Sequence, residues 1–430
     1  MFRVWESTAP QLSQFGLNSG PIRAQFGLNS GDDPMIRLSL PRDRIRRRRM
    51  RAKLTNISLM CVLSVATAWV VTRSTDGTGF NPPAALRQAL LVRTDPQPSP
   101  ASRRGQPEKV GAAAIDEPAN RFGYKLRPGP YAVAEVSDFI LHDASREKEL
   151  HIRIFYPVAS GKFPVIVFSH GAGGSQNCCE ELTRHWASYG YITIQPTHAD
   201  SALQRRSAGD ENVRFAQAVR EALQRPALWE ERPLDVSAVI DALADIAKRV
   251  PVLTGKIDSQ RIGVGGHSMG SFTAEAIAGA LVAFPGKPAT SFADPRAKAI
   301  LCLSPQGPGQ FGLTDKSFQS LTIPYLGITG SEDNLGMLAT SSWHKLPFEL
   351  SPHGNKYHLF IAGANHMSFI SSHTQLPSNS DRGEAILRYT NSAALAFWDA
   401  YLKTDGNAKK YLRSDALTIF SKGAAKLDED

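Results

Sequence analysis

The sequence predicts an α/β fold built on a doubly wound, mostly parallel sheet of about eight strands. From residue 131 onward, short apolar runs typical of strands alternate with amphipathic runs typical of helices. The central strand-like runs are almost continuously apolar, as expected of strands that are buried on both faces. The chain has 430 residues, 42% of them hydrophobic, so it can bury the core of one large domain.

The predicted elements follow in chain order. Two strands at residues 131–141 and 149–157 are separated by a polar segment, which predicts a hairpin. The later strands are the apolar runs at 163–171, 191–198, 261–268, 297–305, 323–330 and 356–363. The helices are the periodic runs at 178–190, 234–250, 271–281 and 391–403. The folded domain is therefore expected to span residues 131–430.

A polar insertion with helical stretches, residues 199–233, follows the strand predicted at 191–198. It leaves the carboxyl end of that strand, which is the edge where open α/β sheets bind ligands. Two interpretations remain open here, a cap over a binding pocket and a solvated excursion.

The positive charge of the chain is concentrated at its N-terminal end. The formal net charge is +9, yet residues 1–54 hold 11 of the 49 Lys and Arg residues and 4 of the 40 Asp and Glu residues. The remaining residues together carry only +2. A phosphate-binding surface is not indicated, and we expect no nucleic-acid partner.

A basic run at residues 42–53 leads into an uncharged apolar stretch at 57–71. This order is typical of a secretory signal peptide or a short membrane anchor, and a basic RNA-binding arm beside a core helix is the alternative. We expect residues 35–72 to direct the protein to the periplasm or out of the cell. If residues 57–71 are not cleaved, we expect them to be its only contact with a membrane. Residues 73–130, rich in Pro, Gly, Ser and charge, are expected to be a flexible linker.

A seven-residue duplication, Gln14–Gly20 and Gln25–Gly31, precedes this basic run. It is far too short for a repeat architecture. We expect translation to start at Met35 or Met50, with residues 1–34 either disordered or absent from the native protein.

The clearest candidate catalytic residue is Ser268, which lies between Gly266 and Gly270 in the sequence Gly-His-Ser-Met-Gly. A strand is predicted before this segment and a helix after it, which is the context of a nucleophile elbow. Such a turn exposes the serine hydroxyl and directs the N–H groups of the following helix at an oxyanion. The alternative is a glycine-rich turn in which Ser268 caps the helix.

A serine also needs an oxyanion hole, a base and an acid. The sequence Ser-His-Gly-Ala-Gly-Gly-Ser at 169–175 ends a predicted strand, and its glycines let the Ala172 N–H join that of Met269 as oxyanion donors. His170 within it is expected to be structural.

Asp333 follows the strand predicted at 323–330 and is the expected acid, with Glu332 as its rival. His366 follows the strand predicted at 356–363 and is the expected base. The order Ser, Asp, His is the one that this type of fold uses. The competing histidines are His344, His353, His358 and His373.

The segment from residue 131 to 403 resembles an α/β-hydrolase in its "PVIVFSHGAGGS", "RPLDVSAVIDAL", "RIGVGGHSMGS" and "GANHMSF" motifs. More narrowly, it is similar to bacterial dienelactone-hydrolase-like proteins related to platelet-activating-factor acetylhydrolases. The resemblance implies a serine esterase. The mechanism expected for Ser268, His366 and Asp333 requires no metal or organic cofactor.

Two departures limit this resemblance. Dienelactone hydrolases proper use a cysteine nucleophile, whereas this chain has Ser268. In the acetylhydrolases the acid follows the strand after the elbow, where this chain has Ser304 and Pro305. The resemblance therefore moves the acid to the next strand and Asp333.

We expect an exported serine hydrolase that cleaves small or polymeric carboxylic esters through an acyl-enzyme on Ser268. The same triad would serve a polyester or lipid hydrolase, a thioesterase or a peptidase. Two functions without catalysis also stay open, a silent binding protein on a hydrolase scaffold and a membrane-tethered structural protein. Cys178, Cys179 and Cys302 show no metal-ligand spacing; a disulfide from Cys302 to Cys178 or Cys179 and free buried thiols both remain open.

Overall fold

The computed structural model describes residues 123–210, 213–334, 339–370 and 380–430. The expectations for residues 1–34, 35–72 and 73–122 lie outside this part of the chain. Residues 123–130, expected to belong to the flexible linker, are described, and Tyr124 among them is buried and donates a hydrogen bond to Asp399 at 2.9 Å. Among the helices that are described, none is both long and apolar enough to cross a membrane.

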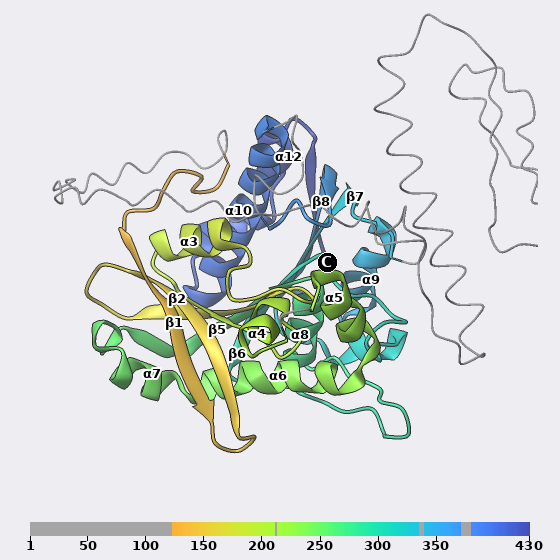
Figure 1. Ribbon diagram of the computed structural model, residues 1–430. Coiled ribbons are helices and arrows are strands. Elements are labelled where there is room, and N and C mark those ends of the chain that lie inside the picture. Colours follow the sequence, from red (N-terminus) through yellow and green to blue (C-terminus); the bar gives the residue numbers. More distant parts are fainter. Residues whose placement is uncertain (1–122, 211–212, 335–338, 371–379) are drawn as a thin grey trace, which may run out of the picture. The chain divides into compact units, whose positions relative to one another are not determined.

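The described residues form one nine-stranded sheet in the order β1-β2-β4-β3-β5-β6-β7-β8-β9 (Figure 1). The strands from β3 to β8 run parallel to one another, while β1, β2 and β9 pair antiparallel with their neighbours. The strand bounds are β1 Val133–Asp143, β2 Lys148–Pro157, β3 Phe163–Ser169, β4 Ile192–Pro196, β5 Ile257–His267, β6 Ala297–Leu303, β7 Tyr325–Glu332, β8 Lys356–Asn365 and β9 Ala425–Glu429.

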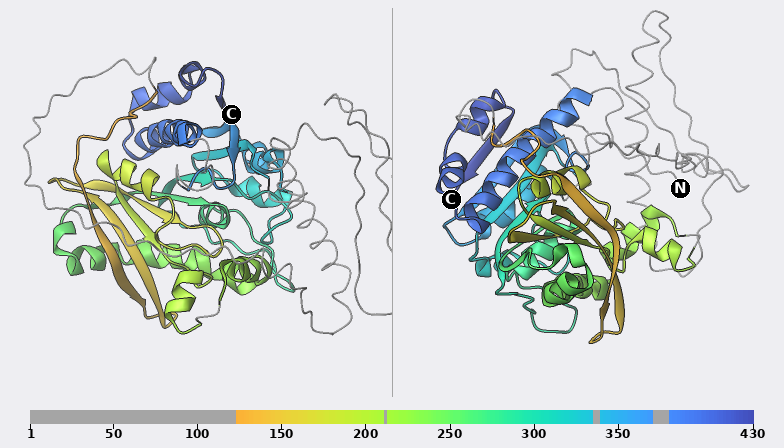
Figure 2. Two further views of the ribbon diagram at one scale, coloured as in Figure 1. Left: turned by 45° about the horizontal axis from the view of Figure 1, so that its top comes forward. Right: turned by 90° about the vertical axis from the view of Figure 1, so that its left-hand side faces the viewer.

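Helices cover both faces of this sheet (Figure 2). Strand β3 shows why: Val165 and Val167 belong to one buried cluster with α6, α7 and α8, while Ile166 and Phe168 belong to a second with α3 and α10. The helix bounds are α3 Glu180–Ser188, α4 Ala202–Ser207, α5 Phe215–Gln224, α6 Pro226–Asp241, α7 Leu243–Arg249, α8 Met269–Ile277, α9 Ser341–Leu350, α10 Ser380–Leu402, α11 Gly406–Leu412 and α12 Ala416–Phe420.

The predicted fold class is confirmed, because this mixed sheet with helices on both faces is an α/β-hydrolase fold. Each predicted strand is present, and β9 is an additional edge strand. The helix predicted over 234–250 is two helices, α6 and α7, separated at Ala242. Helix α6 begins at Pro226, eight residues before the predicted helix start at 234. The last residues of the expected insertion 199–233 therefore belong to this helix.

Candidate active site

Ser268 occupies a sharp turn between β5 and α8. Its backbone has φ 56° and ψ −119°, a conformation that residues with a side chain rarely adopt and that marks functional turns. A Cβ on Gly266 would lie 2.1 Å from the Gly270 carbonyl oxygen, and one on Gly270 would lie 2.0 Å from the Ser169 carbonyl oxygen. Glycine is therefore required on both sides of Ser268. Ser268 is partly exposed although His267 and Met269 beside it are buried.

The structure brings His366 and Asp333 together. His366 follows β8, and its Nδ1 donates a hydrogen bond of 2.9 Å to Asp333 Oδ1. Asp333 follows β7 and is fully buried. Its other oxygen, Oδ2, accepts hydrogen bonds from Ser304 Oγ at 2.7 Å and Thr329 Oγ1 at 2.9 Å. Burial alone would raise the pKa of Asp333, but hydrogen bonds from His344 and His366 hold this pKa well below its usual range.

Asp333 and its rival Glu332 lie in opposite environments. The Glu332 side chain is 55% exposed and pairs with Arg382 at 3.1 Å. Asp333 alone of the two meets His366. Ser304, which directly follows β6, donates a hydrogen bond from its hydroxyl to Asp333.

The competing histidines lie in several different places. His353 is exposed and pairs with Asp430, His358 is buried within β8, and His373 lies outside the described residues. His344, in α9, is the one that sequence reasoning underestimated. Its Nε2 lies 3.3 Å from Asp333 Oδ1, and its Nδ1 is 2.5 Å from the Pro305 carbonyl oxygen. No local pattern indicated this contact, because α9 was not predicted.

The loop that carries His366 lies against the elbow. His267 Nε2 donates to the His366 carbonyl oxygen at 2.8 Å, and the centres of the two imidazole rings are 4.8 Å apart. Burial lowers the pKa of His267 to about 3, so this ring stays neutral. Among the described residues, the Ser268 hydroxyl makes no hydrogen bond with His366 or any other group. Catalytic hydrogen bonds are often long in ligand-free enzymes and shorten on substrate binding.

Two backbone N–H groups beside Ser268 are free to bind an anion. Within the described part of the chain, neither the Ala172 nor the Met269 N–H donates a hydrogen bond. Met269 is the first residue of α8, where the helix dipole favours negative charge. The Ala172 loop is close, since a Cβ on Gly171 would lie 3.5 Å from Ser268 Cβ. These are the two donors that the sequence predicted.

A second Ser-His-Asp chain lies beneath this loop, and it was not predicted. Ser169 Oγ donates to His198 Nε2 at 2.8 Å, and His198 Nδ1 donates to Asp235 Oδ2 at 2.9 Å. All three residues are fully buried. The predicted structural role of His170 agrees with its surroundings, because its buried ring accepts the His198 backbone N–H at 3.0 Å.

One cluster in the described residues has the composition of a metal site. Ligand atoms of Asp333, His344 and His366 all lie within 4.8 Å of one another, and a carboxylate with two imidazoles suits a zinc-like ion. The same atoms are used by the hydrogen bonds described above, which tie His366 Nδ1 to Asp333. A chelator can therefore distinguish metal-dependent chemistry at this cluster from catalysis by a hydrogen-bonded His366–Asp333 pair.

Helix α5 of the insertion packs over the Ala172 loop. A Cβ on Gly173 would lie 3.1 Å from Val219 Cγ2 and 3.2 Å from the Phe215 ring. Phe215 is nevertheless 54% exposed. An apolar ring thus lies at the edge of the candidate site.

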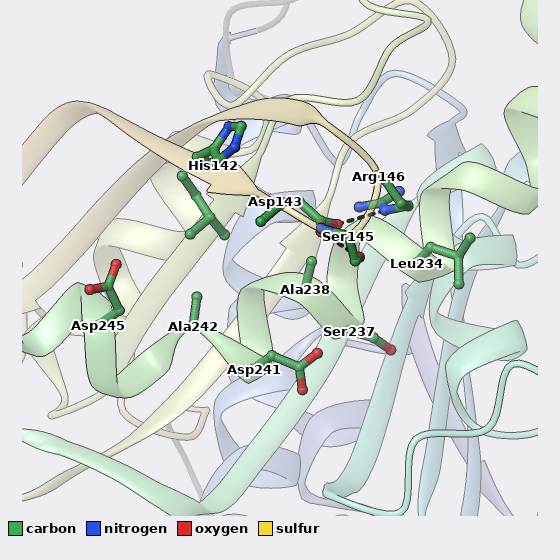
Figure 3. Close-up of a pocket in the computed structure, with 12 residues that line it drawn as sticks. His142, Asp143, Ser145, Arg146, Leu234, Ser237, Ala238, Asp241, Ala242 and Asp245 are labelled. Atoms are coloured by element: carbon green, nitrogen blue, oxygen red, sulfur yellow. Dashed lines mark hydrogen bonds and ion pairs between the residues drawn. The ribbon is translucent and has the colours of Figure 1, made fainter.

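A surface hollow elsewhere on the molecule shares no residue with this site. It lies between the β1–β2 turn and α6, and Figure 3 shows Asp143, Arg146 and Asp241 among its lining residues. Asp143 and Arg146 form an ion pair of 2.6 Å at its rim. The described cysteines, Cys178, Cys179 and Cys302, are all free thiols.

Comparison with known proteins supports the same superfamily. A family model described as Chlorophyllase matches residues 127–287, a region that includes the Ala172 loop and Ser268 and ends before Asp333 and His366. A Schizosaccharomyces pombe protein named "Putative phospholipase A2" is 41% identical over 49 residues. That match spans 11% of this chain and 11% of the relative. Both matches cover only part of the chain and agree with its α/β-hydrolase fold, and the narrower resemblance to dienelactone hydrolases and acetylhydrolases stays a prediction.

Proposed function

We propose that the chain is a serine hydrolase of carboxylic esters, with Ser268 as nucleophile, His366 as base and Asp333 as the acid that orients His366. In acylation, His366 Nε2 accepts the Ser268 proton while Ser268 Oγ attacks the acyl carbon. The Ala172 and Met269 N–H groups stabilise the oxyanion, and His366 then protonates the leaving alcohol. In deacylation, His366 activates a water molecule that releases the acid.

The observation that carries this proposal is the contrast between the two Ser-His-Asp sets. Ser169 has a complete Ser-His-Asp hydrogen-bond chain, but it is fully buried in the interior, where no substrate can reach it. Ser268 is partly exposed, has a strained backbone and lies beside two N–H groups that have no partner among the residues the structure describes. A nucleophile requires this accessibility as well as a base.

The substrate class that we propose is an ester with an apolar group close to the scissile bond. Phe215 supports this, because its exposed ring lies over the loop that carries Ala172. Under this proposal residues 199–233 act as a cap that contributes an apolar wall. Thioester, peptide and polyester cleavage are the competing activities that a substrate panel separates.

The test is hydrolysis of p-nitrophenyl esters of increasing acyl length by the full chain, beside a thioester and a peptide anilide. The parent protein is expected to hydrolyse the esters, and Ser268→Ala to reduce kcat by about 10⁴-fold to 10⁶-fold. EDTA should leave the rate unchanged. Full activity of Ser268→Ala would refute the proposal, and loss of activity with EDTA would instead favour metal chemistry at Asp333, His344 and His366.

We also propose, on the sequence alone, that the protein is exported by residues 35–72. N-terminal sequencing of the product from its native host tests this proposal. A mature chain that starts just after residue 68 indicates a cleaved signal peptide, and a chain that retains 57–71 in the membrane fraction indicates an anchor. A full-length product in the soluble cytoplasmic fraction would contradict export.

A further inference from the structure

The loop at residues 169–173 is held from below by Arg232 of α6, whose side chain is fully buried. The Arg232 guanidinium donates to the His170 carbonyl oxygen from Nη1 at 2.7 Å and to the Gly171 carbonyl oxygen from Nη2 at 3.3 Å. It also forms a two-pronged pair with Asp200, at 2.9 Å from Nε and 2.8 Å from Nη2. Because this two-pronged pair fixes the guanidinium plane relative to the carboxylate plane, Arg232 presents its remaining donors to the loop in one orientation.

Asp200 fastens the other side of the same loop. Its Oδ2 accepts the Gly173 backbone N–H at 2.7 Å. Ala172 therefore lies between two bonded neighbours, Gly171 through its carbonyl and Gly173 through its N–H. The Ala172 N–H itself, within the described part of the chain, is left without a partner. The loop is thus fixed on both sides of the Ala172 N–H.

His198 and Asp235 complete this support. The His198 backbone N–H donates to His170 Nε2, and its ring accepts the Ser169 hydroxyl. Asp235 holds the opposite ring nitrogen of His198 and is itself paired with Lys148 at 2.9 Å and Arg146 at 2.7 Å. Arg146 is the residue at the rim of the hollow in Figure 3. The support therefore extends from the loop to the β1–β2 turn.

We propose that Arg232 and Asp200, backed by His198 and Asp235, are positioning residues that hold the Ala172 N–H where the oxyanion forms. Buried ion pairs contribute little to stability compared with apolar packing, because both charges must be desolvated. Here the pair directs three of its hydrogen bonds at the backbone of a single loop. The second Ser-His-Asp chain is part of this support and performs no chemistry of its own. This inference rests on the proposed ester hydrolysis.

The test compares Arg232→Lys and Asp200→Asn with Asp399→Asn in the full-length protein. Asp399 is a matched control: it is a buried carboxylate paired with Lys403 at 2.9 Å and Tyr191 at 2.6 Å, among the residues of the other core cluster. Steady-state kinetics on a p-nitrophenyl ester give kcat and KM, and the melting curve gives the folded fraction. Binding of an alkyl boronic acid, which forms a tetrahedral anion on the serine, reports the oxyanion hole directly.

Per folded molecule, Arg232→Lys and Asp200→Asn are expected to lower kcat about 10-fold to 100-fold, because a displaced loop weakens one oxyanion donor. Boronic acid affinity should fall by the same factor, while KM stays within about twofold. Asp399→Asn should lower the melting temperature and leave kcat unchanged. If Arg232→Lys does not fold, Ser169→Ala, which removes only the hydroxyl between His198 and Arg232, should still lower kcat several-fold.

Two results would overturn the inference: unchanged kcat and boronate affinity in the folded loop variants, or an equal kcat loss in Asp399→Asn. A failure of the proposed function looks different. In that case the parent protein would neither cleave esters nor bind the boronic acid, or Ser268→Ala would keep its activity.

Discussion

Asp333→Asn is the substitution whose effect follows most directly from the described contacts. The Ser304 and Thr329 hydroxyls both donate to Oδ2. An asparagine at this position would therefore keep its oxygen toward these two donors and turn its NH₂ group toward His366. The amide would then donate to His366 Nδ1, which forces the imidazole proton onto Nε2. In this tautomer Nε2 cannot accept the proton of Ser268.

The expected loss in kcat is about 10⁴-fold, the scale on which a wrong histidine tautomer reduces triad catalysis. This factor corresponds to about 5 kcal/mol in activation free energy. KM is expected to change little, because the fully buried Asp333 side chain is out of reach of a substrate. The protein should remain folded, since the amide preserves the volume of the carboxylate and the acceptor for Ser304 and Thr329.

The assay is p-nitrophenyl ester hydrolysis, with Glu332→Gln as the matched control. Glu332 is the adjacent carboxylate and its side chain is 55% exposed, so its amide variant should keep parental kcat. Activity of Asp333→Asn within about tenfold of the parent would refute the tautomer argument. Equal losses in the two variants would show that Asp333 has no special role.

Three further predictions concern the elbow, a buried acid and the thiols. Gly270→Ala should abolish activity and lower the free energy of unfolding, measured by chemical denaturation, by about 3 kcal/mol, because its Cβ would lie 2.0 Å from the Ser169 carbonyl oxygen. Gly406→Ala is the control and should do neither, because nothing lies near a Cβ at that position. Burial raises the pKa of Glu275 well above its usual range, so this carboxyl stays protonated in the folded protein. The free energy of unfolding should therefore fall as the pH rises above the pKa of Glu275 in the unfolded chain, about 4.3. Glu275→Gln should remove that loss, which urea titrations at pH 5 and pH 8 would detect, and an equal pH dependence in both proteins would argue against a buried protonated acid. Iodoacetamide should modify partly exposed Cys178 in the native protein, while burial raises the pKa of Cys179 and Cys302 and protects them until unfolding, as peptide mass mapping can verify.

The sequence was sufficient to predict the sheet and to place the candidate site residues at the ends of apolar strands. Ser268, Asp333 and His366 each follow such a strand, and the parallel arrangement brings these ends to one edge. Strand β9 was missed because its sequence, AKLDE, is short and polar and becomes a strand only by pairing with β8. This is a tertiary effect without a local pattern.

The contacts around the acid and the loop could not be predicted, because they join segments far apart in the sequence. From the sequence, Ser304 was notable only because a carboxylate was expected at its position. Its hydrogen bond to Asp333 depends on the pairing of β6 with β7. Arg232 and Asp235 lie in the motif "RPLDVSAVIDAL", which served in the sequence analysis as evidence for the α/β-hydrolase resemblance and predicted no contact. Their partners are 32 to 63 residues away, at Ser169, His198 and Asp200.

The central claim is that Ser268, and not the buried Ser169, is the nucleophile. Mass mapping of the full-length protein after reaction with a fluorophosphonate tests it most directly. We expect one adduct on the peptide that contains Ser268, absent in Ser268→Ala and present in Ser169→Ala. An adduct on the peptide that contains Ser169, or no adduct on the parent protein, would contradict this claim.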